Sequence, residues 1–195
     1  MPETTVHRKG DVLAAAERLF AERGYEATSV RDIAEGLGIK AGSLYAHIET
    51  KEDLLWDILT AAAERFFEAV GPIAGSDLVP VEKLKRAIAA HVQVICASAR
   101  SAGIYTTEWR HLAEPRRTRF AGRRDEYERM FRGMVHECIR GGRFQDVDEK
   151  FATLLILSSI NWIYQWYRPD GPMTPEEIAQ KLTEMFFKGL MRVGA

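Results

Sequence analysis

Apolar residues recur along this chain at intervals of three and four, and no stretch alternates apolar and polar residues as a half-buried strand does. The first helical segment runs from about residue 7 to residue 23. One of its faces carries Leu13, Ala16, Leu19 and Phe20, and Gly24 follows it as a C-terminal cap. The pattern predicts an opening amphipathic helix that ends in a glycine turn.

Three further segments follow in close succession. Ser29 stands three residues before Asp32, the spacing of a capping box, so a helix is expected to begin there. Its apolar stripe is Val30, Ile33, Ala34 and Leu37. A very short helix is expected from about residue 40 to residue 48, anchored by Ile39, Leu44 and Ile48. A long helix is expected to begin at Thr50 and to continue to about residue 70.

The remainder of the chain reads as helices joined by short loops. The clearest loop is GPIAGSDLVP at residues 71–80, and RPDGP at 168–172 forms a turn because proline and glycine both break helices. The expected helices are 81–100, 103–112, 115–141, 146–167 and 174–193. The fold class predicted is therefore all-α with about nine helices, divided into a three-helix domain at 1–52 and a larger helical domain at 53–195.

The second and third helices form a helix-turn-helix, a pair in which the second helix enters the DNA major groove. Small residues at Ala41, Gly42 and Ser43 would allow close approach to DNA, and Tyr45 and His47 offer donors to phosphates. The start of the next helix, with Lys51, provides a further anion site. The competing interpretation is a plain packing unit, with a half-buried Tyr45 and a solvated His47.

The stretch AAAERLFAERGYEATSVRDIAEGLGIKAGSLYAHIETKEDLL, residues 14–55, resembles the DNA-binding domain of the tetracycline-repressor (TetR) family in order and spacing. The resemblance implies phosphate contacts from Ser29, Ser43, Tyr45, His47 and Lys51, with Thr28 beside them. It implies contacts to bases or sugars from Lys40, Ala41 and Gly42. The sequence departs from the family pattern at Lys40, Ala46 and Ile48. We therefore expect the operator contacts at Lys40 and Ala46 to differ from those of other family members.

The charge of the chain does not by itself indicate a nucleic-acid partner. The formal net charge is −1, and residues 1–53 contain seven Lys and Arg against ten Asp and Glu. Operator binding must then depend on helix N-termini and a few placed donors. We therefore expect the affinity to fall with salt less steeply than it would for about ten neutralised phosphates.

The second domain is expected to provide the dimer interface through its last two helices. The final helix carries a stripe of Ile178, Leu182, Met185, Phe186 and Leu190, and the helix before it is apolar on more than one face. As the family resemblance implies, these helices would form a homodimer that reads a near-palindromic double-stranded DNA operator with recognition helices about one DNA turn apart.

The second domain also contains candidate residues for a small-molecule effector. Aromatic and methionine residues could line an apolar cavity, and they are Tyr105, Trp109, Phe131, Met134, Trp162 and Trp166. An arginine-rich stretch at 114–134 is either a solvated helix face or an anion site, for which Arg116, Arg117 and Arg123 are the candidates. EWRHLAEPRR and NWIYQWYRPDGPMTPEEIA resemble segments of TetR-type repressors of fatty-acid or sterol degradation. The leading effector is therefore a long-chain acyl-CoA, and a drug-like or aromatic effector of an efflux or degradation operon is the alternative.

Other classes of protein are disfavoured. No HExxH, paired ExxH or nucleophile-elbow motif is present, so we expect no enzyme activity, no catalytic residues, no metal site and no cofactor. Cys96 and Cys138 fit reduced core thiols, and no signal peptide or membrane span is evident. The chain is thus expected to be cytoplasmic without a membrane partner. A helical interaction module without DNA binding is a distant alternative.

Overall fold

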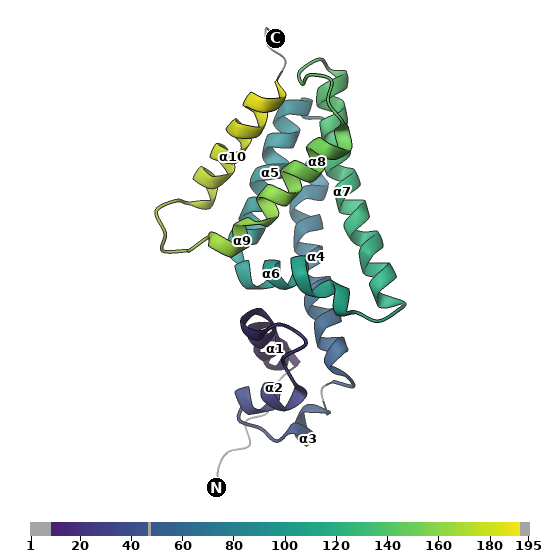
Figure 1. Cartoon of the computed structure of the whole chain (residues 1–195), viewed down its shortest axis with the longest axis vertical. Coiled ribbons are helices and arrows are strands. Elements are labelled where there is room, and N and C mark those ends of the chain that lie inside the picture. The colour runs from purple at the N-terminus through teal and green to yellow at the C-terminus, as the bar shows by residue number, and fades with distance from the viewer. Residues whose placement is uncertain (1–8, 47, 192–195) are drawn as a thin grey trace.

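The computed structural model describes residues 9–46 and 48–191. Within these residues the chain forms ten α-helices, one short 3-10 helix and an isolated bridge between Phe144 and Met191. The predicted all-α fold is confirmed. A small unit of α1–α3 lies at one end of the molecule, and a larger bundle extends away from it (Figure 1). The helices are α1 (Lys9–Arg23), α2 (Val30–Gly36), α3 (Ala41–Leu44), α4 (Lys51–Ala74), α5 (Pro80–Ala97), α6 (Ala99–Thr107), η1 (Glu108–His111), α7 (Arg116–Arg140), α8 (Glu149–Asn161), α9 (Ile163–Trp166) and α10 (Pro175–Leu190).

The N-terminal unit forms for the reasons that its sequence indicates. α1 buries Val12, Ala16, Leu19 and Phe20, and Gly24 follows it at φ 83°, a conformation that favours glycine. The predicted capping box is present at α2, where the Ser29 side chain accepts from the Asp32 backbone and Asp32 accepts in return. α3 is shorter than predicted, since it ends at Leu44.

Helix α4 joins the two parts of the molecule. It begins with a second capping box between Thr50 and Asp53, and it buries residues along its length from Leu54 to Val70. It continues to Ala74, beyond the end predicted near residue 70, with Pro72 in its final turns. A proline there removes only one intrahelical hydrogen bond shortly before the helix ends. α4 therefore passes as one continuous helix from the N-terminal unit into the bundle.

Two of the predicted long segments are broken in the structure. The chain leaves the helical conformation at Ser98 (φ −150°, ψ 72°), so α5 ends at Ala97 and α6 occupies 99–107. The segment predicted as one helix over 146–167 divides at Trp162 into α8 and the short α9. Neither break is marked by proline or glycine, so apolar periodicity alone does not reveal them.

The bundle core lies around α5, which packs against α4, α7, α8 and α10. Its buried side chains include Leu84, Ile88, Val92 and Ile95. Cys138 is buried, Cys96 is partly buried, and both are free thiols. No single helix in the described part of the chain is long and apolar enough to cross a membrane. One pair reaches that length together, α5 with residues 99–111, but it is bent by 105°.

Candidate DNA-binding face and effector cavity

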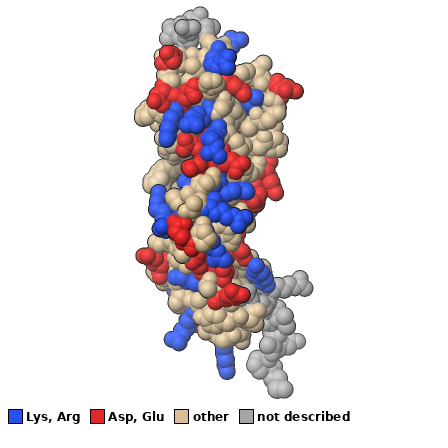
Figure 2. Space-filling view, turned by 90° about the vertical axis from the view of Figure 1, so that its right-hand side faces the viewer, with Lys and Arg blue, Asp and Glu red and all other residues tan. Residues whose placement is uncertain are grey.

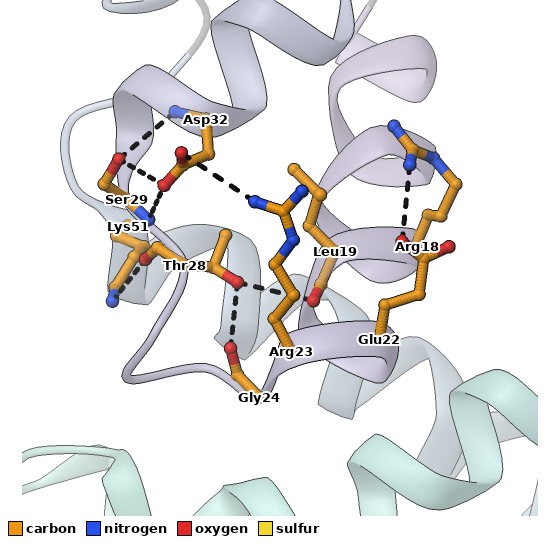
Figure 3. Close-up of polar contacts among 9 residues, drawn as sticks. All are labelled: Arg18, Leu19, Glu22, Arg23, Gly24, Thr28, Ser29, Asp32 and Lys51. Carbon is orange, nitrogen blue, oxygen red and sulfur yellow. Dashed lines mark hydrogen bonds and ion pairs between the residues drawn. The ribbon is translucent and has the colours of Figure 1, made fainter.

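Thr28 lies inside the turn between α1 and α2. Its hydroxyl donates to the Gly24 carbonyl at 2.8 Å and lies 3.3 Å from the Leu19 carbonyl oxygen, at the C-terminal end of α1 (Figure 3). The residue is only 1% exposed. In the free protein this hydroxyl stabilises the end of α1 and is not available to DNA, so the position of Thr28 does not support the predicted phosphate contact from its side chain.

Lys51 also turns towards the protein. Its ammonium donates to the carbonyl oxygens of Tyr25 and Thr28, both at 2.8 Å, and lies 4.0 Å from the centre of the Tyr25 ring. Burial lowers the pKa of this ammonium. In the free protein Lys51 joins the start of α4 to the α1–α2 turn rather than extending towards a phosphate, as the sequence had predicted.

The outer side of α3 is open. Lys40, Gly42, Ser43 and Tyr45 are exposed, and Ala41 is partly buried. A Cβ built on Gly42 would meet no atom within 4 Å, and the backbone there is not in the left-handed region. The fold itself therefore does not require a glycine at this position, in contrast to Gly24 and Gly38, which have positive φ. A residue without a side chain at Gly42 is what close approach by an external surface requires.

Ser29 is exposed beside this face as the N-cap of α2, with its hydroxyl 2.5 Å from a carboxylate oxygen of Asp32. His47, the remaining predicted contact, lies outside the described residues. In Figure 2 basic side chains project from the α1–α3 end of the molecule, and acidic and basic residues are mixed over the rest of that face. The DNA contacts remain predictions, now centred on Ser29, Lys40, Ala41, Gly42, Ser43 and Tyr45.

The 3-10 helix η1 holds the α1–α2 turn to the bundle. The backbone N–H of Tyr25 donates to a Glu108 carboxylate oxygen at 3.1 Å. His111 lies between Glu26 and Glu108, with nitrogen–oxygen distances of 3.3 and 3.5 Å, and stacks on the Tyr25 ring. We call Tyr25, Glu26, Glu108 and His111 the η1 contact. It connects the end of α6 directly to the turn that precedes α2.

Arg116 makes a second connection between the two parts of the chain. Its guanidinium lies 2.6 Å from Asp53 and 3.5 Å from Glu52, at the start of α4, and packs over the Trp56 ring. This hydrogen bond lowers the pKa of the Asp53 carboxyl. Arg116 is therefore a connection from α7 to the N-terminus of α4, and the prediction that it binds an effector is not supported by its position.

A cavity of about 390 Å³ lies within the bundle, at the lower end of the ~300–1,000 Å³ typical of ligand sites. Its walls come from α5, α6, α7, α8 and the residue that follows α8. Among the predicted effector residues, it brings together Tyr105 and Trp162. The other lining residues are His91, Thr106, Arg124, Asp125, Tyr127, Glu128, Leu154, Leu157, Ser158 and Asn161.

The remaining predicted effector residues lie elsewhere. Phe131 and Met134 are buried in the core, Trp109 packs against Phe120, and Trp166 is partly exposed on α9. Arg117 pairs with Glu114, and Arg123 pairs with Glu64 while packing over the Phe67 ring. These side chains do not line the cavity, so the structure corrects the predicted set.

The arginine that reaches the cavity is Arg124. Its guanidinium donates to the Tyr105 carbonyl at 3.1 Å and lies over the rings of Tyr105 and Trp109. Burial lowers its pKa, and no carboxylate of the described residues lies within ion-pair distance. Helical spacing does not distinguish it in the sequence. Arg124 stands four residues after the buried Phe120 and three before Tyr127, but Arg123 stands three after Phe120 and four before Tyr127.

The inner end of the cavity is polar. His91 Nδ1 lies 2.9 Å from the Tyr127 hydroxyl oxygen, and Nε2 lies 3.2 Å from the Asn161 side-chain oxygen. His91 is buried, and this burial lowers its pKa to about 3. The imidazole is therefore neutral at physiological pH, so one ring nitrogen donates and the other accepts.

We expect the neutral state of His91 to make stability depend on pH. Because the unfolded chain binds this proton near pH ~6.5 and the folded chain does not until about pH 3, acidification favours unfolding. The contribution is fully present above about pH 6.5 and declines below it, by at most ~1.4 kcal/mol per pH unit. Denaturant titrations at several pH values measure this slope. A His91→Gln variant, which retains a polar side chain without titrating, should show a shallower slope, and equal slopes would contradict the assignment.

Large apolar side chains are exposed on α8, on α10 and at the residue that follows α8. On α8, Phe151 is 70% exposed and Leu155 is 48% exposed, and Trp162 follows at 60%. Met185 on α10 is 70% exposed, and Leu182 and Phe186 are partly exposed. α10 instead buries Ile178, Ala179 and Phe187. Several large apolar side chains left exposed on two helices are typical of a protein–protein interface.

The two parts of the chain each match a described protein family. Residues 12–57 match "Bacterial regulatory proteins, tetR family", and residues 77–190 match "Tetracyclin repressor-like, C-terminal domain". The chain belongs to the TetR family of bacterial transcriptional regulators. The resemblance seen in the sequence is thereby confirmed. TetR-family proteins are regulators rather than enzymes, which also confirms the expectation that this chain is not an enzyme.

Relatives of known name cover nearly the whole chain. The HTH-type transcriptional repressor KstR2 of Mycobacterium tuberculosis is 32% identical over 190 residues, which are 96% of this chain and 94% of KstR2. Its structure, described as a ketosteroid transcriptional regulator, matches with a TM-score of 0.89 over 97% of both chains. AibR, solved with isovaleryl coenzyme A and operator DNA, is 28% identical with a TM-score of 0.84, over 93% of this chain and 98% of AibR. This TetR-family chain is thus a transcriptional repressor of the helix-turn-helix type.

Proposed function

We propose that this TetR-family repressor binds a palindromic operator as a homodimer and is released from it by an acyl-CoA. The observation that carries the choice of effector is the cavity, which combines aromatic walls with a desolvated, unpaired Arg124. An acyl-CoA has a thioester carbonyl oxygen and a strongly anionic CoA moiety, and an unpaired guanidinium can donate hydrogen bonds to either. The AibR complex with isovaleryl coenzyme A supports this effector class. Such a repressor would act in the cytoplasm.

The cavity also bears on the acyl group. Its inner end presents His91, Tyr127 and Asn161, and its volume is modest, so a compact acyl group with a polar atom fits better than a long unbranched chain. The description of KstR2 as a ketosteroid regulator is consistent with this preference. We propose control of genes for degradation of fatty acids or related lipids, with the long-chain acyl-CoA predicted from sequence as one member of the series to be tested.

A mobility-shift assay on the DNA that flanks the gene tests this proposal. Wild-type protein should shift the fragment, and CoA thioesters should release it, with isovaleryl-, lauroyl- and palmitoyl-CoA as a size series. Free CoA serves as the control. Retention of the complex with every thioester would refute the effector class. The absence of a shift on any promoter fragment would refute DNA binding itself and favour the interaction-module interpretation.

The aromatic walls of the cavity favour one alternative effector. Tyr105, Tyr127 and Trp162 would stack against a planar aromatic or drug-like compound, for which Arg124 could provide a cation–π contact. Release of the operator by such a compound, but by no CoA thioester, would establish this alternative within the same repressor mechanism.

The connections between the two parts of the chain indicate how the cavity would influence the operator. Tyr105 and Thr106 line the cavity from α6, and α6 leads directly into Glu108 and His111 of the η1 contact. An effector that displaces α6 would therefore pull on the α1–α2 turn, while α4 and Arg116 transmit movement to the recognition helix. The effector must bind the released conformation more tightly for this to occur.

We expect Glu108→Ala to weaken this coupling. The variant removes the acceptor of the Tyr25 N–H and one partner of His111, so α6 can move without moving the turn. Effector affinity measured without DNA should change less than twofold. The ratio of the effector affinity without operator to the effector affinity with operator should fall at least ~5-fold, within the range of typical allosteric couplings. Glu126→Ala, an exposed acid on α7, is the control. An unchanged ratio would show that the η1 contact does not transmit the signal.

A further inference from the structure

A second hollow, of about 210 Å³, adjoins the effector cavity in the groove between α7 and α8. It is lined by Asp125, Glu128, Arg129, Arg132 and Lys150. Asp125 and Glu128 also line the cavity, so the two spaces meet at these residues. The hollow therefore lies at the mouth of the cavity, and a ligand that filled the cavity could extend into it.

The three cations of this hollow are unpaired. Arg129, Arg132 and Lys150 make no ion pair or hydrogen bond with any side chain in the described part of the chain, although Asp125 and Glu128 share the same hollow. Elsewhere on α7, Arg116, Arg117 and Arg123 each pair with a carboxylate. Arg119, Arg124 and Arg140 of α7 also have no carboxylate partner among the described residues, but none of them lines this hollow. Three unpaired cations gathered in one hollow beside the cavity resemble an anion site rather than a uniformly solvated face.

The spacing on α7 explains the arrangement. Asp125, Glu128, Arg129 and Arg132 occupy positions i, i+3, i+4 and i+7, which lie along one helix face. Lys150 faces them from the first turn of α8. The face passes from the aromatic and polar lining of the cavity to a strip of positive charge. That order matches a molecule with an acyl group at one end and phosphates at the other.

We propose that Arg129, Arg132 and Lys150 bind the phosphate groups of the effector's nucleotide, while its acyl group occupies the cavity. We call these three residues the basic ledge. The assignment rests on the proposed acyl-CoA function for the identity of the ligand. It replaces the arginines that the sequence suggested for this role. Guanidinium groups can hold phosphates in bidentate pairs, and the free ammonium adds a point charge.

The ledge is tested with two thioesters of one acyl group, isovaleryl-CoA and isovaleryl-pantetheine, which lacks the nucleotide and its phosphates. Calorimetric titration should show that wild-type protein prefers the CoA thioester by about tenfold or more, as expected for charge-assisted contacts. Arg129→Ala/Arg132→Ala should lose most of this preference while binding the pantetheine thioester as before. Arg140→Ala/Arg143→Ala removes two exposed arginines outside the hollow and should retain it.

The outcomes separate the ledge from the effector proposal. If the Arg129/Arg132 variant keeps the full preference for the CoA thioester, the ledge is wrong and the effector proposal stands. If wild-type protein binds no CoA thioester, the effector proposal fails, and adenosine 3′,5′-bisphosphate then tests the ledge alone. Binding of this nucleotide by wild-type and control proteins, with loss in the Arg129/Arg132 variant, would support a phosphate site there. Equal or absent binding in all three would overturn it.

Discussion

Replacing both Phe151 and Leu155 with Asp is expected to convert the protein into a monomer and to lower operator affinity at least ~100-fold. These side chains are exposed on α8 in the single chain, and neither lines the effector cavity. In a two-fold dimer formed through α8, each of these residues would be buried in both protomers. In the variant, the two introduced carboxylates of each protomer would have to be desolvated without partners. A monomer engages one half-site, so it loses the gain from simultaneous binding of both.

Sedimentation and operator titration at matched protein concentrations measure this effect. Val79→Asp is the control, because Val79 is an equally exposed apolar residue at the N-cap of α5, where aspartate is well tolerated. It should leave the dimer intact. A double variant that remains dimeric and binds the operator normally would show that the interface lies elsewhere. Circular dichroism would check that the double variant is folded.

Tyr45→Ala is expected to lower operator affinity by about 100-fold with little effect on stability. Tyr45 is 57% exposed at the end of α3, and its removal leaves no cavity in the core. A hydrogen bond to a charged group contributes ~1.5–3 kcal/mol, and a palindromic operator involves the residue twice. The loss should be similar for all operator variants, since phosphate contacts carry no direct sequence information.

Tyr45→Phe separates the hydroxyl from the ring. If the hydroxyl donates to a phosphate, this variant should lose most of the same affinity, measured by fluorescence anisotropy on labelled operator. If Tyr45→Phe binds normally, the ring provides the contact instead. Normal binding by Tyr45→Ala would mean that α3 does not present this residue to DNA.

The sequence predicted the DNA-binding unit better than the effector site, and the reason is physical. Helix-turn-helix contacts depend on local spacing, so capping boxes at Ser29 and Thr50 and the glycine turn at Gly24 could be recognised directly. Even there, the direction of a side chain was not predictable. Thr28 and Lys51 are polar and close to the expected DNA surface, yet both satisfy carbonyl oxygens within the protein.

The effector cavity depends on how five separate segments pack, and the sequence does not specify this. Arginines along α7 look alike in sequence, but their partners come from distant segments: Asp53 for Arg116 and Glu64 for Arg123. The break at Trp162, which places that side chain at the cavity, has no proline or glycine to mark it. Helical spacing does not identify the arginine that enters the cavity either, because Arg123 and Arg124 both lie three or four residues from the buried Phe120 and Tyr127.

Asp53 illustrates a consequence for the construction of hybrid regulators. This one carboxylate caps the start of α4 through Thr50 and also binds Arg116 of α7. A chimera that joins residues 1–52 of this chain to the bundle of another regulator would lose the partners of Tyr25 and Glu26, and its graft point would fall beside the shared carboxylate. A chimera designed to keep the DNA specificity of this protein should therefore include Asp53, Glu108, His111 and Arg116 together with the recognition helix α3.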